Sequence, residues 1–168
     1  SALNLPEDGS SPEGEEIDKL WESRVELLTI DAQGKLVEDR DLNGDGQTNE
    51  ADVAFARAAV KGTDSPPEIL AVYARRDGSQ TGAYAIPMYG AGLWGPISGY
   101  LALKPNAEEV LGATFFAPKE TPGLGAEIVK EPFKQQWVGK KIAQNGSMKA
   151  IRVVKGSADL LCAGEVDY

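Results

Sequence analysis

Two glycine-rich segments contain residue types that suit contact with a flat ligand. Residues 120–125, ETPGLG, continue past the single glycine or Pro-Gly pair that a simple chain reversal requires. Residues 89–95, YGAGLWG, place glycines around Leu93 and Trp94. Glycine lets the backbone approach a ring closely, and an aromatic side chain can contact a ring face. The two segments together predict a site for a planar ligand.

Each segment also has an ordinary structural interpretation, and the residues alone leave it open. Thr121-Pro122-Gly123 fits a type II turn, and residues 87–103 fit a bulged strand crossing in which Trp94 is a core residue. Three nearby charged residues, Glu127, Lys130 and Lys134, are interpreted as surface charges.

A second pattern, DLNGDGQTNEAD at residues 41–52, has the spacing of a calcium-binding loop. Oxygen-bearing residues alternate along it, Gly46 occupies the sixth position where an EF-hand turns sharply, and the seventh residue would contribute its backbone carbonyl. The predicted ligands are Asp41, Asn43, Asp45, Gln47 and Asp52. The alternative is a surface turn rich in Asn and Asp, followed by a helix N-cap, with no metal.

Composition excludes several classes of function. The chain has 168 residues, with 26 acidic residues, 17 basic residues and no histidine, so its formal net charge is −9. This charge argues against binding to nucleic acid or to anionic membrane surfaces. The absence of histidine removes Ser/His/Asp and Cys/His catalysis, and a hydrolase would need a carboxylate pair that no motif identifies. The single cysteine, Cys162, is expected to be a buried inert thiol.

The elements expected to position these residues form a single domain that follows a flexible tether. Residues 1–16 are acidic and rich in Pro, Gly and Ser, so we expect a flexible tether there and a single domain over 17–168, with the calcium loop inserted at 41–52. Hairpin signals occur around residues 77–80 and 104–106, and helix signals occur at 50–62 and within 131–142, where Pro132 opens the helix and Gly139 closes it. A short strand is expected within 31–37 and a final strand at 148–156. The predicted fold class is α+β, with a mostly antiparallel sheet and flanking helices.

Four segments in the second half carry a resemblance to a known family. They are YGAGLWGPISGYLAL, ETPGLGAEI, FKQQWVGKKI and AIRVVKG. In this order and spacing they resemble the C subunit of the sodium-translocating NADH:quinone reductase. Its FMN-binding domain is shared with the G subunit of the ferredoxin:NAD oxidoreductase complex. The resemblance is close over 87–168 and loose before it.

The resemblance implies a flavoprotein that carries electrons on FMN as a non-autonomous subunit of a bacterial inner-membrane complex, working with the other subunits. It implies that the soluble domain lies on the periplasmic, outer face, and that a membrane helix, missing here, precedes the tether. It also implies a flavin transferase that attaches FMN to a threonine of a Ser-Gly-Ala-Thr motif. That motif is absent before Tyr168, and Thr114 is expected to be a sheet residue. The chain as written is therefore expected to lack covalent FMN.

The resemblance also assigns site residues, which would form a backbone platform and a facing wall for the isoalloxazine ring. Amide N–H groups of the platform are expected to meet ring oxygens and nitrogens. The implied FMN-binding residues are Gly90, Gly92, Leu93, Trp94, Glu120, Thr121, Gly123, Leu124, Gly125 and Lys155. The competing function is a calcium-braced extracellular interaction module in which loop 41–52 is the working feature and the glycine segments are ordinary turns.

Overall fold

The computed structural model describes residues 15–31, 33, 35–37, 41, 69–117 and 119–151. The first element is helix α1 (Glu15–Arg24), which leads directly into strand β1 (Val25–Asp31). Residues 23–30, whose sequence fits either a helix end or a strand, contain the end of α1 and most of β1. Within the described residues, no helix is long and apolar enough to cross a membrane.

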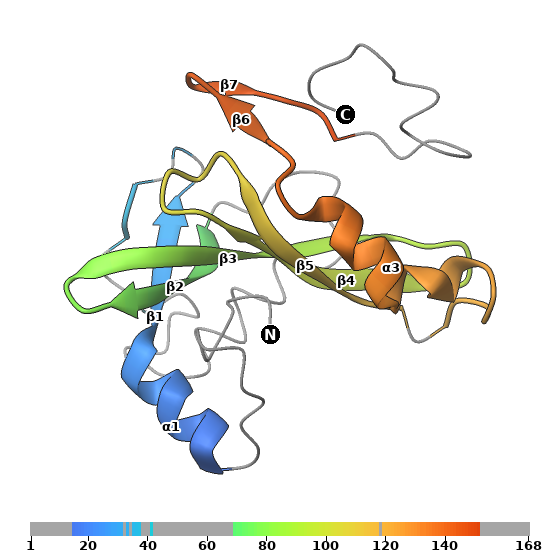
Figure 1. Ribbon diagram of the computed structural model, residues 1–168, viewed down its shortest axis with the longest axis horizontal. Helices are drawn as coiled ribbons and strands as arrows, with labels where there is room; N and C mark the ends of the chain where they lie inside the picture. The colour runs from blue at the N-terminus through green and yellow to red at the C-terminus, as the bar shows by residue number, and fades with distance from the viewer. Residues whose placement is uncertain are drawn as a thin grey trace.

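A five-stranded antiparallel sheet forms the centre of the molecule (Figure 1). Its strands are β1, β2 (Ile69–Asp77), β3 (Gln80–Ala91), β4 (Pro96–Leu103) and β5 (Val110–Phe116). The spatial order is the chain order, so each strand pairs with its sequence neighbour. This arrangement confirms the predicted α+β class with an antiparallel sheet.

Turn residues account for the two hairpins that the sequence predicted. Gly78 has φ +64° in the turn between β2 and β3, a backbone angle that glycine adopts without steric cost. Between β4 and β5, Ala107 has φ +56° although it carries a Cβ atom. Thr114 lies within β5, which confirms that it is a sheet residue.

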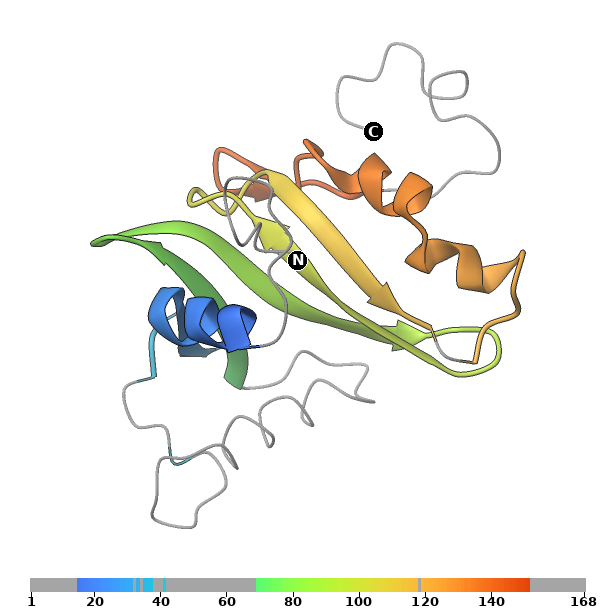
Figure 2. The same cartoon turned by 60° about the horizontal axis from the view of Figure 1, so that its bottom comes forward.

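The two faces of the sheet are covered by different elements (Figure 2). On one face, Trp21 of α1 packs on Tyr73, with ring centroids 5.4 Å apart, and Tyr73 packs edge-on against Tyr100. The other face is covered by three short helices: η1 (Gly125–Val129), α3 (Glu131–Lys134) and η2 (Gln135–Trp137). There, Phe115 of β5 contacts the rings of Phe133 and Trp137.

The core on this second face holds the most deeply buried large side chains. Leu103 and Val110, at the ends of β4 and β5, are each 1% exposed and pack with Leu101 and Ala113. Trp137 closes this cluster from the helical side. The helices after residue 125 are therefore held to the sheet by apolar packing, which in turn places the segment that precedes them.

Three further elements expected from the sequence are short in the structure. The helix predicted between Pro132 and Gly139 is present as the two short helices α3 and η2, and Gly139, the predicted stop, has φ +80°. The final strand predicted at 148–156 is wrong over 149–151, since the described pairing there is limited to the small ladder of β6 (Ala143–Gln144) with β7 (Ser147–Met148). The strand predicted within 31–37 is reduced to a single bridge between Ile30 and Leu36.

Several predicted segments lie outside the described residues. They are residues 1–14 of the tether predicted at 1–16, whose last two residues instead begin α1, together with the helix at 50–62, residues 42–52 of the calcium loop and the remainder of the final strand. Cys162 also lies outside them.

Candidate functional site

The two glycine-rich segments meet at the end of the sheet where β3 turns into β4. The turn between these strands is closed by a hydrogen bond from the Gly92 amide to the Gly95 carbonyl, 2.8 Å long. Residues 119–125 leave the end of β5 and pass beside this tip before η1 begins (Figure 1). Antiparallel pairing of β3, β4 and β5 thus brings together segments that are some thirty residues apart in the sequence.

The segment Thr121–Leu124 is a hydrogen-bonded β-turn. The Leu124 amide donates to the Thr121 carbonyl at 3.1 Å, Pro122 occupies the second position, and Gly123 has φ +78° at the third. Proline followed by a residue of positive φ identifies a type II turn. The interpretation of Thr121-Pro122-Gly123 as a type II turn is therefore correct for the backbone. The same turn also places the Leu124 side chain in solvent.

Glu127 holds this turn from the first turn of η1. One of its carboxylate oxygens accepts the Gly123 amide at 2.9 Å, and the other pairs with Lys130 Nζ at 2.8 Å. The hydrogen bond with the Lys130 ammonium is the main cause that lowers the pKa of the Glu127 carboxyl group. Desolvation partly opposes it, and the bond from the Gly123 amide adds a smaller lowering effect.

Sequence reasoning placed Glu127 and Lys130 among the surface charges and missed their role in closing the turn. A signal was present, since Leu124 is the N-cap of η1 and a glutamate three residues after an N-cap commonly reaches back to an upstream amide.

Glu120 joins the two glycine-rich segments. Its side chain is one of two buried polar or charged side chains among the described residues, with 8% exposure. Its Oε1 accepts the Trp94 amide at 2.9 Å, across 26 positions of sequence. A carboxylate that takes a backbone amide forms a charge-assisted hydrogen bond, so this contact is a strong tie between the hairpin tip and the turn.

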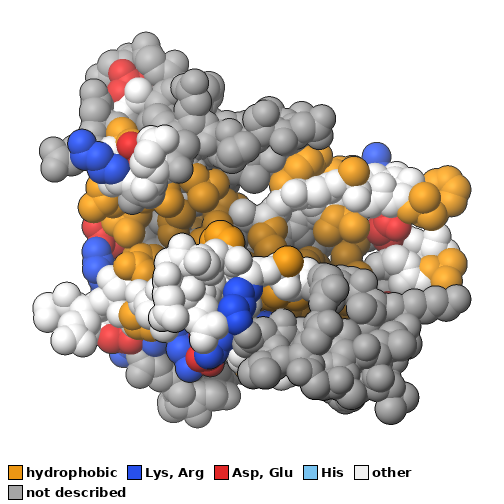
Figure 3. Space-filling view, turned by 90° about the horizontal axis from the view of Figure 1, so that it is seen from above, with side chains coloured by type: hydrophobic (Ala, Val, Ile, Leu, Met, Phe, Trp, Pro, Cys, Tyr) orange, Lys and Arg blue, Asp and Glu red, His pale blue; other side chains and the backbone are white. Residues whose placement is uncertain are grey.

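Three large apolar side chains on these segments point into solvent. Leu93 is 81% exposed, Trp94 is 65% exposed and Leu124 is 73% exposed. Hydrophobic side chains are visible at this end of the molecule, at the right of Figure 3. Trp94 is therefore a surface residue, which excludes the alternative that it is a core tryptophan. Exposed large apolar groups gathered on one surface are typical of a binding site.

The backbone around these side chains is open at two glycines. At Gly90 and at Gly123 an added Cβ atom would meet nothing within 4 Å, so a ligand can approach the main chain there. In contrast, the amides of Gly92, Trp94, Gly123 and Leu124 all donate to acceptors inside the chain. These four amides already donate hydrogen bonds within the chain, so they are not available to the oxygens and nitrogens of a ligand ring. The described residues would therefore contact a ligand mainly through their side chains and through the open backbone at the two glycines.

The other predicted site residues are mostly outside the described part of the chain. Among the predicted calcium ligands only Asp41 is described, as a half-buried residue, and Asn43, Asp45, Gln47 and Asp52 are outside it. Lys155 is outside it as well. Within the described residues no group of three carboxylate or cysteine side chains is arranged to hold a metal ion. The calcium loop therefore stays a prediction.

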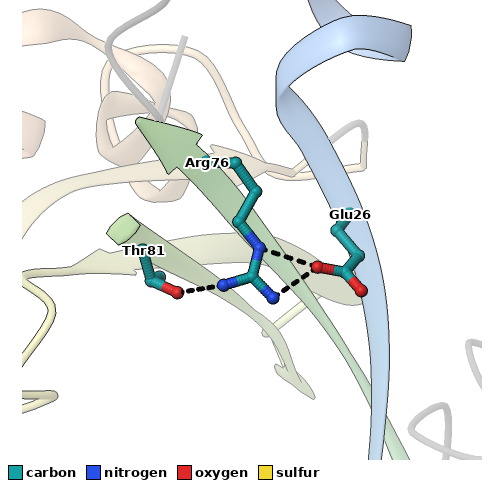
Figure 4. A network of polar contacts seen from close by, with 3 residues as sticks. All are labelled: Glu26, Arg76 and Thr81. Atoms are coloured by element: carbon teal, nitrogen blue, oxygen red, sulfur yellow. Dashed lines mark hydrogen bonds and ion pairs between the residues drawn. The ribbon is translucent and has the colours of Figure 1, made fainter. Parts of the chain in front are cut away.

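A separate polar cluster lies at the opposite end of β3. Arg76 donates through Nε to Glu26 Oε2 at 2.7 Å and through Nη1 to Thr81 Oγ1 at 2.6 Å, which links β2 to β1 and β3 (Figure 4). A depression of about 470 Å³ borders it. A strand of the length of β3 separates this cluster from the glycine segments by roughly 35 Å. We therefore treat it as a tie between strands and not as part of the site.

Comparison with known proteins covers the same region. Residues 92–167 match the family model of the FMN-binding domain. The C subunit of the Na(+)-translocating NADH-quinone reductase from Yersinia pestis is 30% identical over 151 residues, which are 86% of this chain and 57% of that protein. The corresponding subunit from Chlamydia caviae is 52% identical over 60 residues, 36% of this chain and 19% of that protein. The chain spans about three fifths of the length of three curated relatives that it matches, the subunits from Yersinia pestis, Vibrio parahaemolyticus and Pseudomonas aeruginosa.

Solved structures show the same fold. The structure of the corresponding reductase subunit from Parabacteroides distasonis has a TM-score of 0.65 at 28% identity, covering 92% of this chain and 70% of that one. NqrC of Shewanella oneidensis has a TM-score of 0.69 at 24% identity, covering 93% of this chain and 75% of that one. The matched family range begins at Gly92 and includes Leu93, Trp94 and the whole of residues 119–125.

Proposed function

The chain belongs to the FMN-binding domain family represented by the C subunit of the Na(+)-translocating NADH-quinone reductase, and from that premise we propose that it is an electron-carrying FMN domain. The observation that supports this best is the solvent-exposed group of Leu93, Trp94 and Leu124 on two segments tied together by Glu120. Large apolar side chains exposed on two adjoining segments are typical of a binding surface, and a planar cofactor would cover them.

The residues present suit the isoalloxazine ring of FMN. We infer that Trp94, Leu93 and Leu124 contact it through their apolar surfaces, while Gly90 and Gly123 let the backbone approach its edge. Residues 121–125 and Gly92 fix the backbone conformation of the segments that carry Leu93, Trp94 and Leu124. Lys155 is proposed as a further contact from the C-terminal region.

FMN, when bound, supplies the electron-transfer chemistry, and the protein supplies binding, orientation and electrostatics. In this chain the apolar side chains exclude water from the covered part of the ring. Glu120 places a carboxylate beneath the wall, and Glu127 fixes the turn that carries Leu124. The protein residues thereby determine where the ring lies and which of its edges faces solvent.

The wider setting of this domain is also a proposal. We propose that residues 17–168 form one domain, that it works within a bacterial inner-membrane reductase complex alongside the other subunits, and that it lies on the periplasmic side. The curated relatives carry the name of an ion-translocating reductase, which supports the complex as its context. A flavin transferase and a threonine beyond Tyr168 would provide covalent attachment, and a membrane helix before the tether would anchor the domain.

Titration with free FMN tests the proposed function directly. The purified chain is added to FMN and flavin fluorescence is followed, since stacking on an indole quenches it. We expect saturable quenching that Trp94→Phe reduces and that a conservative change at the distant cluster, Thr81→Ser, leaves unchanged. Identical flavin emission with and without the chain at high protein concentration would contradict the proposal.

A second experiment addresses covalent attachment. The chain is produced with the residues that follow Tyr168 in its gene, together with a flavin transferase, and in-gel flavin fluorescence is recorded. We expect a fluorescent band from the extended chain and none from the chain ending at Tyr168. A fluorescent band from the shorter chain would show that the anchor lies elsewhere.

We also propose that loop 41–52 binds calcium and braces the domain. Its alternate oxygen-bearing residues, with a glycine at the sixth position, support this proposal. Calcium should raise the melting temperature of the chain relative to excess chelator, because a ligand of the folded state stabilises it by mass action. Asp45→Asn should reduce that difference, and equal melting temperatures in calcium and chelator would refute a bound ion.

A further inference from the structure

Glu120 is buried, although the large apolar side chains on the same two segments are exposed. Its side chain is 8% exposed, whereas the neighbouring Trp94 and Leu124 are mostly in solvent. Its Oε1 is bonded to the Trp94 amide at 2.9 Å, and its own amide donates to the Ala117 carbonyl at 3.2 Å. The carboxylate is therefore directed into the protein, between the hairpin tip and the turn.

Two glycines complete the space that this carboxylate occupies. A Cβ atom added at Gly92 would come closer than 3.0 Å to Glu120 Oε1, and one added at Gly125 would come closer than 3.0 Å to Glu120 Oε2. Each oxygen of the carboxylate thus lies against one glycine, one from each segment. Separations of this kind are essentially never seen for real Cβ atoms, so a side chain at either position must displace the carboxylate.

Gly125 provides the cleaner evidence. All three of the atoms nearest its added Cβ belong to Glu120, whereas the Cβ at Gly92 would also meet the Gly95 carbonyl and Ile97. The closest of these contacts would be with Glu120 Oε2, so a side chain at position 125 requires the carboxylate to shift. The φ of Gly125 is not among the positive values, so backbone conformation does not demand a glycine there.

We propose that Glu120 is a positioning residue that does not contact the ligand and that ties the Leu93–Trp94 tip to the segment of the Leu124 turn: its Oε1 accepts the Trp94 amide, while its Oε2 lies against Gly125. This inference rests on the proposed function in one respect only, namely that the surface it holds together is the FMN-binding wall. It reassigns Glu120 from a direct FMN contact to the internal tie between the two halves of the site. Gly92 and Gly125 leave the space that admits the carboxylate.

The physical consequence is that Trp94 and Leu124 move together. Residues 92–95 form an exposed hairpin tip with a single hydrogen bond across it, between Gly92 and Gly95. Glu120 adds a charge-assisted bond to the middle of that tip. Without it the tip would sample many orientations, and ordering it on binding a ligand would cost affinity.

Backbone amide hydrogen exchange at Trp94, measured by NMR on the full chain, tests the tie without any flavin. In Glu120→Ala the Trp94 amide should exchange about tenfold to a hundredfold faster than in the parent chain, as expected for loss of a hydrogen bond to a charged group. Glu120→Gln keeps an acceptor oxygen and should raise exchange by only a fewfold. Urea unfolding of both variants checks that the change is local.

Gly125→Ala tests the same tie from the other segment. It should displace the carboxylate and speed exchange at Trp94, while Gly90→Ala, where the added methyl meets nothing, should leave it unchanged. In a Glu120→Ala background Gly125→Ala should have almost no further effect, because the displaced group is absent. If Glu120→Ala fails to fold, Glu120→Gln and Gly125→Ala still decide the matter.

Two results would overturn the proposal. One is a Trp94 amide that exchanges at the parent rate in both Glu120→Ala and Gly125→Ala, which would show that the carboxylate holds nothing in solution. The other is full additivity of the two substitutions. Titration with free FMN separates this question from the proposed function: loss of the tie should lower FMN affinity, and absent FMN binding by the parent chain would refute the FMN role alone.

Discussion

Replacing Leu93 by alanine should weaken flavin binding and leave the fold intact. Leu93 is 81% exposed, so the folded state gains little from it. Surface substitutions of this kind usually change the free energy of unfolding by no more than about 0.5 kcal/mol. The same side chain has almost all of its apolar surface available to a ligand.

The expected loss of affinity follows from that exposed area. Complete burial of a leucine side chain is worth roughly 1.5–3 kcal/mol, and a flat ring covers only about one side of it. The loss is then about 1 kcal/mol, or roughly a fivefold increase in the Kd for FMN. Leu124→Ala should behave in the same way, because Leu124 is exposed to a similar extent.

The assay combines two measurements on each variant. Free FMN is titrated by flavin fluorescence, and unfolding in urea is followed by circular dichroism. Leu36→Ala is the matched control, since Leu36 is also an exposed leucine but lies beside β1, at the opposite edge of the sheet from β4 and β5. It should change neither measurement.

Two outcomes would refute this reasoning. If Leu93→Ala lowered the free energy of unfolding in urea by more than about 1 kcal/mol, the side chain would be buried in the folded state. If the Kd for FMN were equal in the parent chain and in Leu93→Ala and Leu124→Ala, the exposed apolar group would not be the ring contact.

Three further predictions concern the framework of the site. Leu103→Ala removes a side chain that is 1% exposed and should lower the free energy of unfolding by about 2–5 kcal/mol in urea titration, with a loss under about 1 kcal/mol contradicting its core position. The lowered pKa of Glu127 means that its contribution is present above the ordinary carboxyl pKa and is lost as the pH falls through the folded value. The protection factor of the Gly123 amide, which is its exchange rate corrected for the intrinsic effect of pH, should therefore fall there in the parent chain, and Glu127→Gln should abolish that change. Ala107→Gly should stabilise the chain by about 1 kcal/mol, because Ala107 adopts φ +56°, and a lower melting temperature would argue against strain at that turn.

Local sequence signals were sufficient for much of the sheet. The turn residues between β2 and β3 and between β4 and β5, flanked by β-prone runs, predicted both hairpins, because two neighbouring strands interact over a short chain distance. Local signals failed around 149–151, where a β-prone run has no strand in this structure. Strand formation depends on a partner edge, and the described edge there belongs only to β6 and β7.

For the site, the sequence by itself determined the residue types and the motifs that point to an FMN-binding domain, and it gave a type II turn at Thr121-Pro122-Gly123 as one of two interpretations. These properties are local or follow from the order of residues. Only the tertiary structure decided that Trp94 is exposed, that Glu120 is buried and that Glu127 closes the turn. The reason is that burial and the Glu120 to Trp94 bond depend on antiparallel pairing across β3, β4 and β5, which brings distant segments together without any trace in the spacing of either one.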